Sequence, residues 1–144
     1  MSLLDIDIRE LLPQQGKFVM IDYLQSINDK TVIASTTVTK ENIFVEGDVF
    51  SEPGIIETIA QTAAARMGYI GKYIDKTGVK LGVIGEIKNF VIERHPHVGE
   101  ELKTVIEIVV EIFSTVMIQA QVFVLNELIA HGSMKISIIN PHET

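Results

Sequence analysis

The sequence contains no cysteine and no apolar run long enough to cross a membrane. The absence of cysteine excludes disulfides, thiol nucleophiles and cysteine-ligated metal sites. A membrane-spanning helix needs about 18 or more consecutive apolar residues, and the N-terminal segment lacks the charged-then-apolar order of a signal peptide. These absences lead us to expect a soluble, cytoplasmic protein that does not insert into a membrane.

Basic residues are also few, with 12 Lys and Arg against 19 Asp and Glu and a formal net charge of −7. The basic residues are scattered, whereas nucleic-acid binding needs a concentrated basic face, so we expect no nucleic-acid partner. An acidic partner such as an acyl carrier protein would need a local cluster of Lys and Arg. The length of 144 residues suits a single domain with a sizeable core.

Metal and phosphate sites are not predicted either. His95 and His97 flank a proline, but two histidines without a third ligand nearby do not make a zinc site. A glycine-rich loop that could bind phosphate is also absent, because Gly82 and Gly85 lie inside a strand-like run. Glycine in a strand marks a bulge or the close approach of a ligand or backbone. We therefore expect no metal and no other cofactor.

One long helix is predicted from Pro53 to Ile74, and Pro53 with Gly54 suits its start. Its apolar positions recur at the spacing of a single helical face. They are Ile55, Ile56, Ile59, Ala60, Ala63, Ala64, Met67 and Ile70. The many small residues leave room for a curved sheet or a thin ligand to approach this helix.

Glu57 is the only acidic side chain between Pro53 and Ile74. It lies at one edge of the apolar face, and Gln61 follows one turn later on the same side. A carboxylate in such surroundings needs a partner, so Glu57 is the first candidate for chemistry. A purely structural explanation is also open, because a Glu in the first turn interacts favourably with the helix dipole.

The other segments predict an α+β fold in which an antiparallel sheet packs against the long helix. Residues 3–15 predict one short helix ending near Pro13. Residues 40–52 predict a loop with aromatic anchors Phe44 and Phe50 and a turn at Gly47 and Asp48. Alternating or β-rich runs predict strands at 18–27 and 31–38, followed after the helix by a meander of three or four long strands within 80–94, 101–113, 115–125 and 128–139.

Three motifs in the right order resemble the hotdog-fold 3-hydroxyacyl-(acyl-carrier-protein) dehydratases. They are LLPQQGKFVMID, FVEGDVFSEPGIIETIAQ and GEIKNFVIERHPHVGEEL, and the match covers almost the whole chain. The resemblance implies a single hotdog domain over residues 1–144, with an antiparallel sheet wrapped around one long central helix. It also implies a homodimer in which two sheets join edge to edge, with larger assemblies possible in similar proteins.

The resemblance places Glu57 on the family's catalytic carboxylate and Gln61 on the glutamine one turn later. In the family a histidine takes the α-proton of a 3-hydroxyacyl thioester, the carboxylate helps the hydroxyl leave, and amides at the helix start bind the thioester oxygen. Those amides would be the ones around Gly54, Ile55 and Ile56. An apolar acyl tunnel is expected at the dimer interface, lined by Phe44, Phe50, Ile55, Ile59 and residues 83–90, which include Gly85.

The chain departs from the family at the histidine itself. The family's histidine should follow Gly47, where this chain has Asp48, and the loop to the helix is about five residues shorter. Asp48 is therefore either a substitute catalytic group or simply a turn residue, and a carboxylate is a weaker base than imidazole. Four histidines remain, and we expect each to be solvated rather than catalytic: His95, His97, His131 and His142.

Three functions fit these observations. The first is a dehydratase-like enzyme that acts on acyl thioesters of acyl carrier protein or coenzyme A in fatty-acid or polyketide-type biosynthesis. The second is an acyl thioesterase that uses Glu57 alone, and the third is a non-catalytic acyl-binding subunit that pairs with an active homologue.

Overall fold

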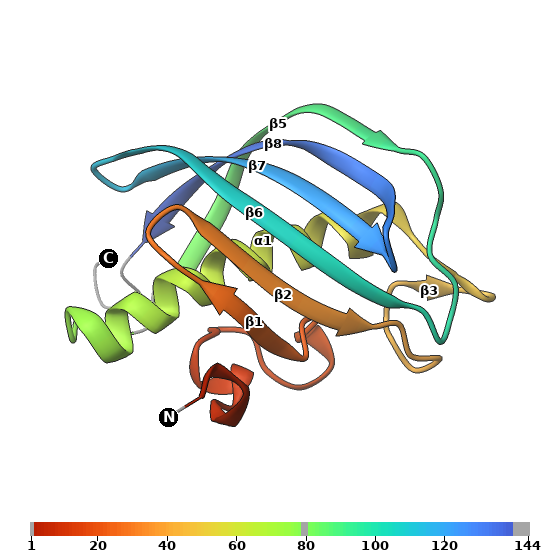
Figure 1. Cartoon of the computed structure of the whole chain (residues 1–144), viewed down its shortest axis with the longest axis horizontal. Coiled ribbons are helices and arrows are strands. Elements are labelled where there is room, and N and C mark those ends of the chain that lie inside the picture. The colour runs from red at the N-terminus through yellow and green to blue at the C-terminus, as the bar shows by residue number, and fades with distance from the viewer. Residues whose placement is uncertain (1, 79–80, 140–144) are drawn as a thin grey trace.

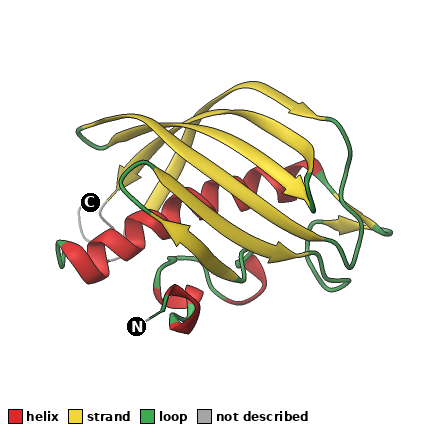
Figure 2. Ribbon diagram, in the orientation of Figure 1, coloured by secondary structure: helices red, strands yellow, loops and turns green. Residues whose placement is uncertain are grey.

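A six-stranded antiparallel sheet curves around one long helix in the computed structural model, which describes residues 2–78 and 81–139 (Figure 1). His142 therefore lies outside the described residues. The helix lies along the concave face of the sheet (Figure 2). This arrangement is the hotdog fold, and it confirms the predicted α+β class.

The strands follow the order β1-β2-β6-β7-β8-β5 across the sheet. A separate two-stranded hairpin, β3 and β4, precedes the helix, and its turn contains Gly47 with φ +65°. The predicted turn at Gly47 and Asp48 is thus confirmed. The strand bounds are β1 Tyr23–Ile27, β2 Thr31–Thr37, β3 Val45–Glu46, β4 Val49–Phe50, β5 Leu81–Ile92, β6 Glu101–Ile112, β7 Thr115–Val124 and β8 Glu127–Ile139.

Alternating burial along the strands builds the core. Along β7 every second residue is buried against the helix, whereas the residues between them are exposed or half-buried. The buried set is Val116, Ile118, Ala120, Val122 and Val124. Strand β6 follows the same rule over its first half, so the predicted period of two is confirmed for both strands.

The central helix α1 spans Glu52–Tyr69 and continues through a π-helical turn, η4, at Ile70–Ile74. The prediction of a helix over 53–74 is therefore confirmed almost to the residue. Gly68 lies on the face of α1 that meets the N-terminal segment, and a Cβ added there would meet the backbone carbonyl of Leu11. The small residue lets backbone approach backbone at this point.

The meander has three strands, β6, β7 and β8, which agrees with the predicted three or four, while β5 pairs with β8 at the far edge of the sheet. The prediction for the N-terminal segment is wrong. Residues 3–15 do not form one helix: η1 (Leu3–Asp5) and η2 (Ile8–Glu10) are separate 3-10 turns, and η3 (Gly16–Phe18) follows. Ser2 caps η1 with its side chain while Asp5 accepts from the Ser2 amide, and Asp7 caps η2; this local bonding competes with a continuous helix.

The predicted strand at 18–27 begins only at Tyr23. The amide of Met20 donates to the side chain of Gln61 instead of to a neighbouring strand. Within the described residues, no helix is both long and apolar enough to span a bilayer.

Candidate functional site

The start of α1, the β3–β4 hairpin and the loop formed by residues 93–100 meet at one end of the molecule (Figure 1). Backbone bonds hold the hairpin and the loop together. The amide of Phe50 donates to the carbonyl of Pro96 at 2.8 Å, and the amide of Val98 donates to the carbonyl of Asp48 at 3.0 Å. Side chains that are nearly 50 residues apart in the sequence are thereby brought to the same place.

Glu57 is half-buried on the second turn of α1, and Gln61 supports its carboxylate. The Nε2 atom of Gln61 donates to Oε1 of Glu57 at 3.0 Å and to the carbonyl of Phe18 at 2.7 Å, while its Oε1 accepts from the amide of Met20 at 2.8 Å. Gln61 is fully buried, so both ends of its amide are used inside the protomer. The pair predicted at the edge of the helical face is therefore joined by a direct hydrogen bond.

We expect Gln61→Ala to lower the free energy of unfolding by about 2 kcal/mol, because it leaves a buried amide and a carbonyl without partners. Urea titration followed by circular dichroism would measure the loss. Gln25→Ala, on an exposed position of β1, is the control and should change stability little. A loss no larger than that of the control would show that Gln61 does not anchor the N-terminal segment.

The start of α1 is closely packed. Phe50 and Ile55 are fully buried, and a Cβ added at Gly54 would meet the Phe50 ring and the Cβ of Phe44. Within the protomer Phe50 therefore fills the space that Gly54 leaves beside the helix. Contact of these residues with an acyl chain at a dimer interface stays a prediction, as does contact by Ile56, which is half-buried.

The amides at this helix start are engaged in its first turn. Those of Gly54 and Ile55 both donate to the carbonyl of Ser51, at 3.0 and 3.2 Å. A thioester oxygen would have to share these donors or replace the Ser51 carbonyl, so their predicted role needs a rearrangement of the first turn.

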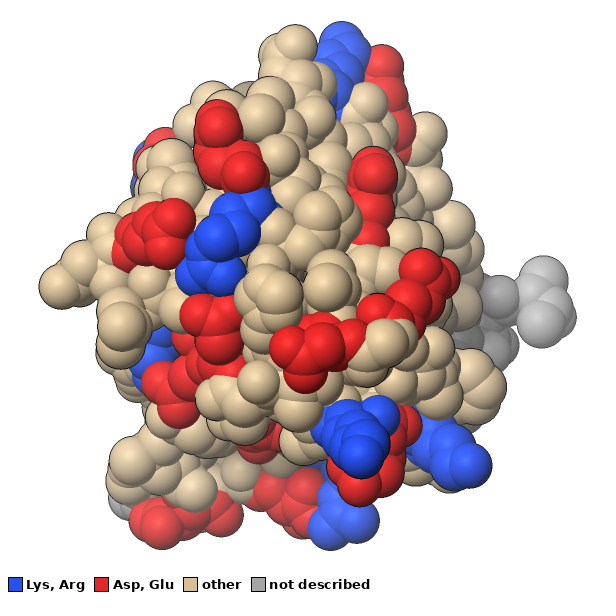
Figure 3. Space-filling view, turned by 90° about the vertical axis from the view of Figure 1, so that its right-hand side faces the viewer, with Lys and Arg blue, Asp and Glu red and all other residues tan. Residues whose placement is uncertain are grey.

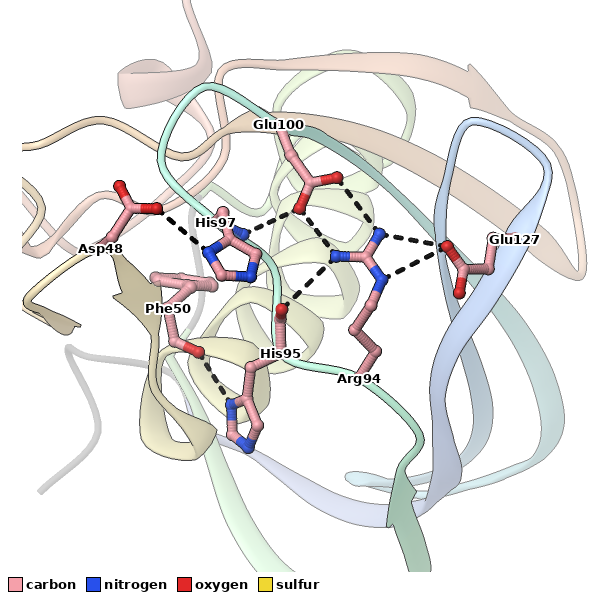
Figure 4. Close-up of polar contacts among 7 residues, drawn as sticks. All are labelled: Asp48, Phe50, Arg94, His95, His97, Glu100 and Glu127. Carbon is pink, nitrogen blue, oxygen red and sulfur yellow. Dashed lines mark hydrogen bonds and ion pairs between the residues drawn. The ribbon is translucent and has the colours of Figure 1, made fainter.

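Asp48 and His97 form a pair that the sequence did not predict (Figure 4). Oδ2 of Asp48 lies 3.0 Å from Nδ1 of His97. The side chains are 71% and 51% exposed, so water screens their interaction. The amide of His97 also donates to Oε1 of Glu100 at 2.8 Å, which fixes the loop beside the pair.

His95 is half-buried and lies beside the first turn of α1. Its Nδ1 is 3.0 Å from the carbonyl oxygen of Phe50. The sequence predicted both histidines to be solvated. His97 is exposed, in agreement with this, whereas His95 is half-buried. Each of the two rings holds a partner 45 or more residues away in the sequence, which the sequence pattern did not indicate.

Arg94 anchors the loop through two carboxylates (Figure 4). It donates to both oxygens of Glu100, at 2.8 and 3.1 Å, and to Oε1 of Glu127 at 3.1 Å. The guanidinium of Arg94, together with the amide of His97, lowers the pKa of Glu100, and the two carboxylates raise the pKa of Arg94. This network ties residues 94–100 to the turn that begins β8.

We expect Glu100→Gln to lower the free energy of unfolding at pH 7 by about 1 kcal/mol, the size of a well-formed ion pair near the surface. Because the folded pKa of Glu100 is depressed, its contribution is complete above its unfolded pKa of about 4.3 and is lost as the pH falls through the lower folded value. Chemical denaturation at a series of pH values would therefore show the wild-type and variant curves converging in acid. A constant gap down to the lowest pH would contradict this account.

The outer edge of the sheet carries the remaining predicted residue, Gly85, in β5. It is exposed, and a Cβ there would make only ordinary contact with the carbonyl of Lys135, at 3.6 Å. Val83, Ile87 and Val91 on the same strand are 43%, 39% and 40% exposed, so β5 presents apolar side chains at an edge of the sheet.

Arg66 is a charged residue of α1 that the sequence reasoning missed. It is only 4% exposed, donates to the carbonyl of Asp29 at 2.9 Å and lies 3.8 Å from a carboxylate oxygen of Glu111. The sequence did offer an indication of this residue, because Arg66 is the one charged side chain in the small-residue stretch just after Gln61. Arg66 ties the second half of α1 to the β1–β2 turn.

Acidic side chains outnumber basic ones on the end of the molecule where α1 begins (Figure 3). In the part of the chain that the structure describes, no three His, Asp or Glu side chains gather closely enough to hold a metal ion.

Comparison with known families gives one match. The model of a family described as "ApeP-like: ApeP dehydratase" matches residues 6–144. No curated protein matches the sequence significantly.

Solved structures share the fold. A chain of "The Dehydratase Heterocomplex ApeI:P from Xenorhabdus doucetiae" superposes with a TM-score of 0.87 and 15% identity, covering 96% of this chain and 94% of that one. Cj0977, a sigma28-regulated virulence protein from Campylobacter jejuni, has a TM-score of 0.70 and 13% identity, covering 94% and 89%. A hypothetical thioesterase from Streptococcus pneumoniae TIGR4, solved with coenzyme A, has a TM-score of 0.61 and 10% identity, covering 81% and 84%.

Proposed function

The chain belongs to the ApeP-like dehydratase family, and we propose that it dehydrates 3-hydroxyacyl thioesters. The observation that carries this proposal beyond family membership is the hydrogen bond from Gln61 to Glu57. This hydrogen bond holds Oε1 of the half-buried Glu57. The other carboxylate oxygen, Oε2, has no partner among the described side chains. A carboxyl group fixed in this way can donate a proton to a leaving hydroxyl.

Dehydration needs two proton transfers. A base removes the proton on C2 of the acyl group, and an acid protonates the hydroxyl on C3 so that it leaves as water. Glu57 is the acid in this proposal. Gln61 positions it, because its own amide is buried and fully bonded within the protomer.

Acyl carrier protein or coenzyme A remain the two candidate carriers, in fatty-acid or polyketide-type biosynthesis. Both are acidic, and the end of the molecule where α1 begins is acidic too (Figure 3). Carrier binding there would be weakened by charge repulsion at low salt, unless a partner subunit contributes basic residues.

A partner subunit is part of the proposal. Strand β5 is an edge with exposed apolar side chains, and pairing it with a second copy would close an open row of backbone groups. A homodimer in the cytoplasm is the simplest form. The Xenorhabdus dehydratase ApeI:P is instead a heterocomplex, so a related but different hotdog chain is the alternative partner.

The test is an assay of the purified chain with two substrates, a 3-hydroxyacyl thioester and the matching plain acyl thioester. A dehydratase forms the 2-enoyl thioester from the first and leaves the second intact. Release of free thiol from both would identify a thioesterase, the function named for one structural neighbour. Binding of both without a product would identify an acyl-binding subunit.

A further inference from the structure

A shallow pocket of about 340 Å³ opens beside the first turn of α1, and His95 is the histidine that lines it. Its other lining residues come from the β3–β4 hairpin and the helix start. They are Glu46, Val49, Ser51, Glu52 and Pro53. An imidazole, two carboxylates and a hydroxyl therefore surround one concave site.

The hydrogen bond to Phe50 fixes the protonation pattern of His95. A carbonyl oxygen can only accept, so the Nδ1 atom of His95 carries the hydrogen that it donates to Phe50 at 3.0 Å. In the neutral ring Nε2 then holds the lone pair and can act as a base. Phe50 is itself fully buried and its amide is bonded to Pro96, so the carbonyl that orients the ring is held firmly.

The pocket opens at the start of the helix that carries Glu57, although Glu57 itself is not one of its lining residues. Pro53 lines the pocket, and Glu57 follows Pro53 by four residues, about one helical turn further along α1. An acyl group lying along this turn would extend from His95 toward the carboxyl group of Glu57.

We propose that His95 is the catalytic base that takes the place of the family histidine missing after Gly47. This assignment rests on the proposed dehydratase function. Nε2 of His95 accepts the proton from C2, the C2–H electron pair forms the C2=C3 double bond, and the C3–O bond breaks with its electrons on oxygen. Glu57 donates the proton that completes water, and it regains a proton from the imidazolium through solvent.

The Asp48–His97 pair is the weaker candidate for the base. Both side chains are more than half exposed, and neither lines the pocket. Figure 4 shows the His97 ring turned toward Asp48 and the His95 ring on another side of the loop. A carboxylate also accepts a proton from carbon less readily than an imidazole does at neutral pH.

The experiment measures turnover of a 3-hydroxyacyl N-acetylcysteamine thioester, which carries no phosphate, by the full-length wild-type chain and its variants. We expect His95→Gln to lower kcat by about 100-fold, the loss of a positioned base. His131→Gln, a histidine on β8, is the matched control and should keep wild-type turnover. Added imidazole should restore turnover to His95→Ala, since a small base can enter the space left by the ring, whereas a structural defect would not be rescued this way.

Two results would overturn the assignment while leaving the dehydratase proposal standing. One is near-normal turnover by His95→Gln. The other is a loss in Asp48→Asn as large as that in His95→Gln, because the base would then belong to the Asp48–His97 pair. A wild-type chain that forms no enoyl product overturns the dehydratase proposal itself, and the role of His95 with it.

Discussion

Glu57→Gln is expected to lower turnover of a 3-hydroxyacyl thioester by about 100-fold or more, the size typical of losing a positioned acid or base. The substitution keeps the shape of the side chain, and its amide oxygen can still accept the hydrogen bond from Gln61. The substitution removes only the proton that, in the proposed mechanism, Glu57 supplies to the leaving hydroxyl. Thermal unfolding should therefore be nearly unchanged.

Steady-state kinetics with the 3-hydroxyacyl thioester would measure this effect, alongside circular dichroism to check folding. Glu107→Gln, on an exposed position of β6, is the matched control and should retain full turnover. If Glu57→Gln stayed as active as this control, Glu57 would have only a structural role, namely its favourable interaction with the dipole near the start of the helix.

The largest expected loss of stability comes from Gly68→Ala in α1. The added Cβ would meet the carbonyl oxygen of Leu11, a backbone atom that cannot turn aside. Alanine favours a helix over glycine by about 1 kcal/mol, but overpacking against backbone outweighs that gain, and we expect a net loss of about 3 kcal/mol. For a chain of this length the midpoint of thermal unfolding would fall by about 10 °C.

Differential scanning calorimetry would compare Gly68→Ala with Gly85→Ala. Gly85 lies in β5, where an added Cβ makes only ordinary contact, so alanine there should leave the midpoint almost unchanged. A midpoint for Gly68→Ala equal to or above that of the wild type would mean that the N-terminal segment shifts away from α1 at little cost.

Periodicity predicted the elements of this fold but not their neighbours. The apolar stripe of α1 and the alternation of β6 and β7 follow from which residues each element buries, and that information is local. The pairing of β5 with β8 is not local, since alternation along β5 is the same whichever strand lies beside it. The N-terminal turns were missed because the capping bonds of Ser2, Asp5 and Asp7 outweigh the helical spacing of the leucines and isoleucines.

In the candidate site, too, the sequence predicted local contacts and missed long-range ones. Glu57 and Gln61 are one turn apart, so the helix alone predicts that they meet. His95 and His97 reach Phe50 and Asp48 only because residues 96 and 98 pair with the β3–β4 hairpin, a contact across nearly 50 residues. In the sequence both histidines flank a proline, and this pattern predicted a solvated turn. The pattern does not indicate that they contact the β3–β4 hairpin.

The most direct test of the dehydratase proposal runs the reaction backwards in ¹⁸O-labelled water. The wild-type chain is incubated with a 2-enoyl thioester, and the products are analysed by mass spectrometry. A dehydratase must also catalyse the reverse hydration, so the label is expected in the hydroxyl group on C3 of an intact 3-hydroxyacyl thioester. Label in the carboxylate of a released free acid, or recovery of the enoyl thioester without label, would contradict the proposal.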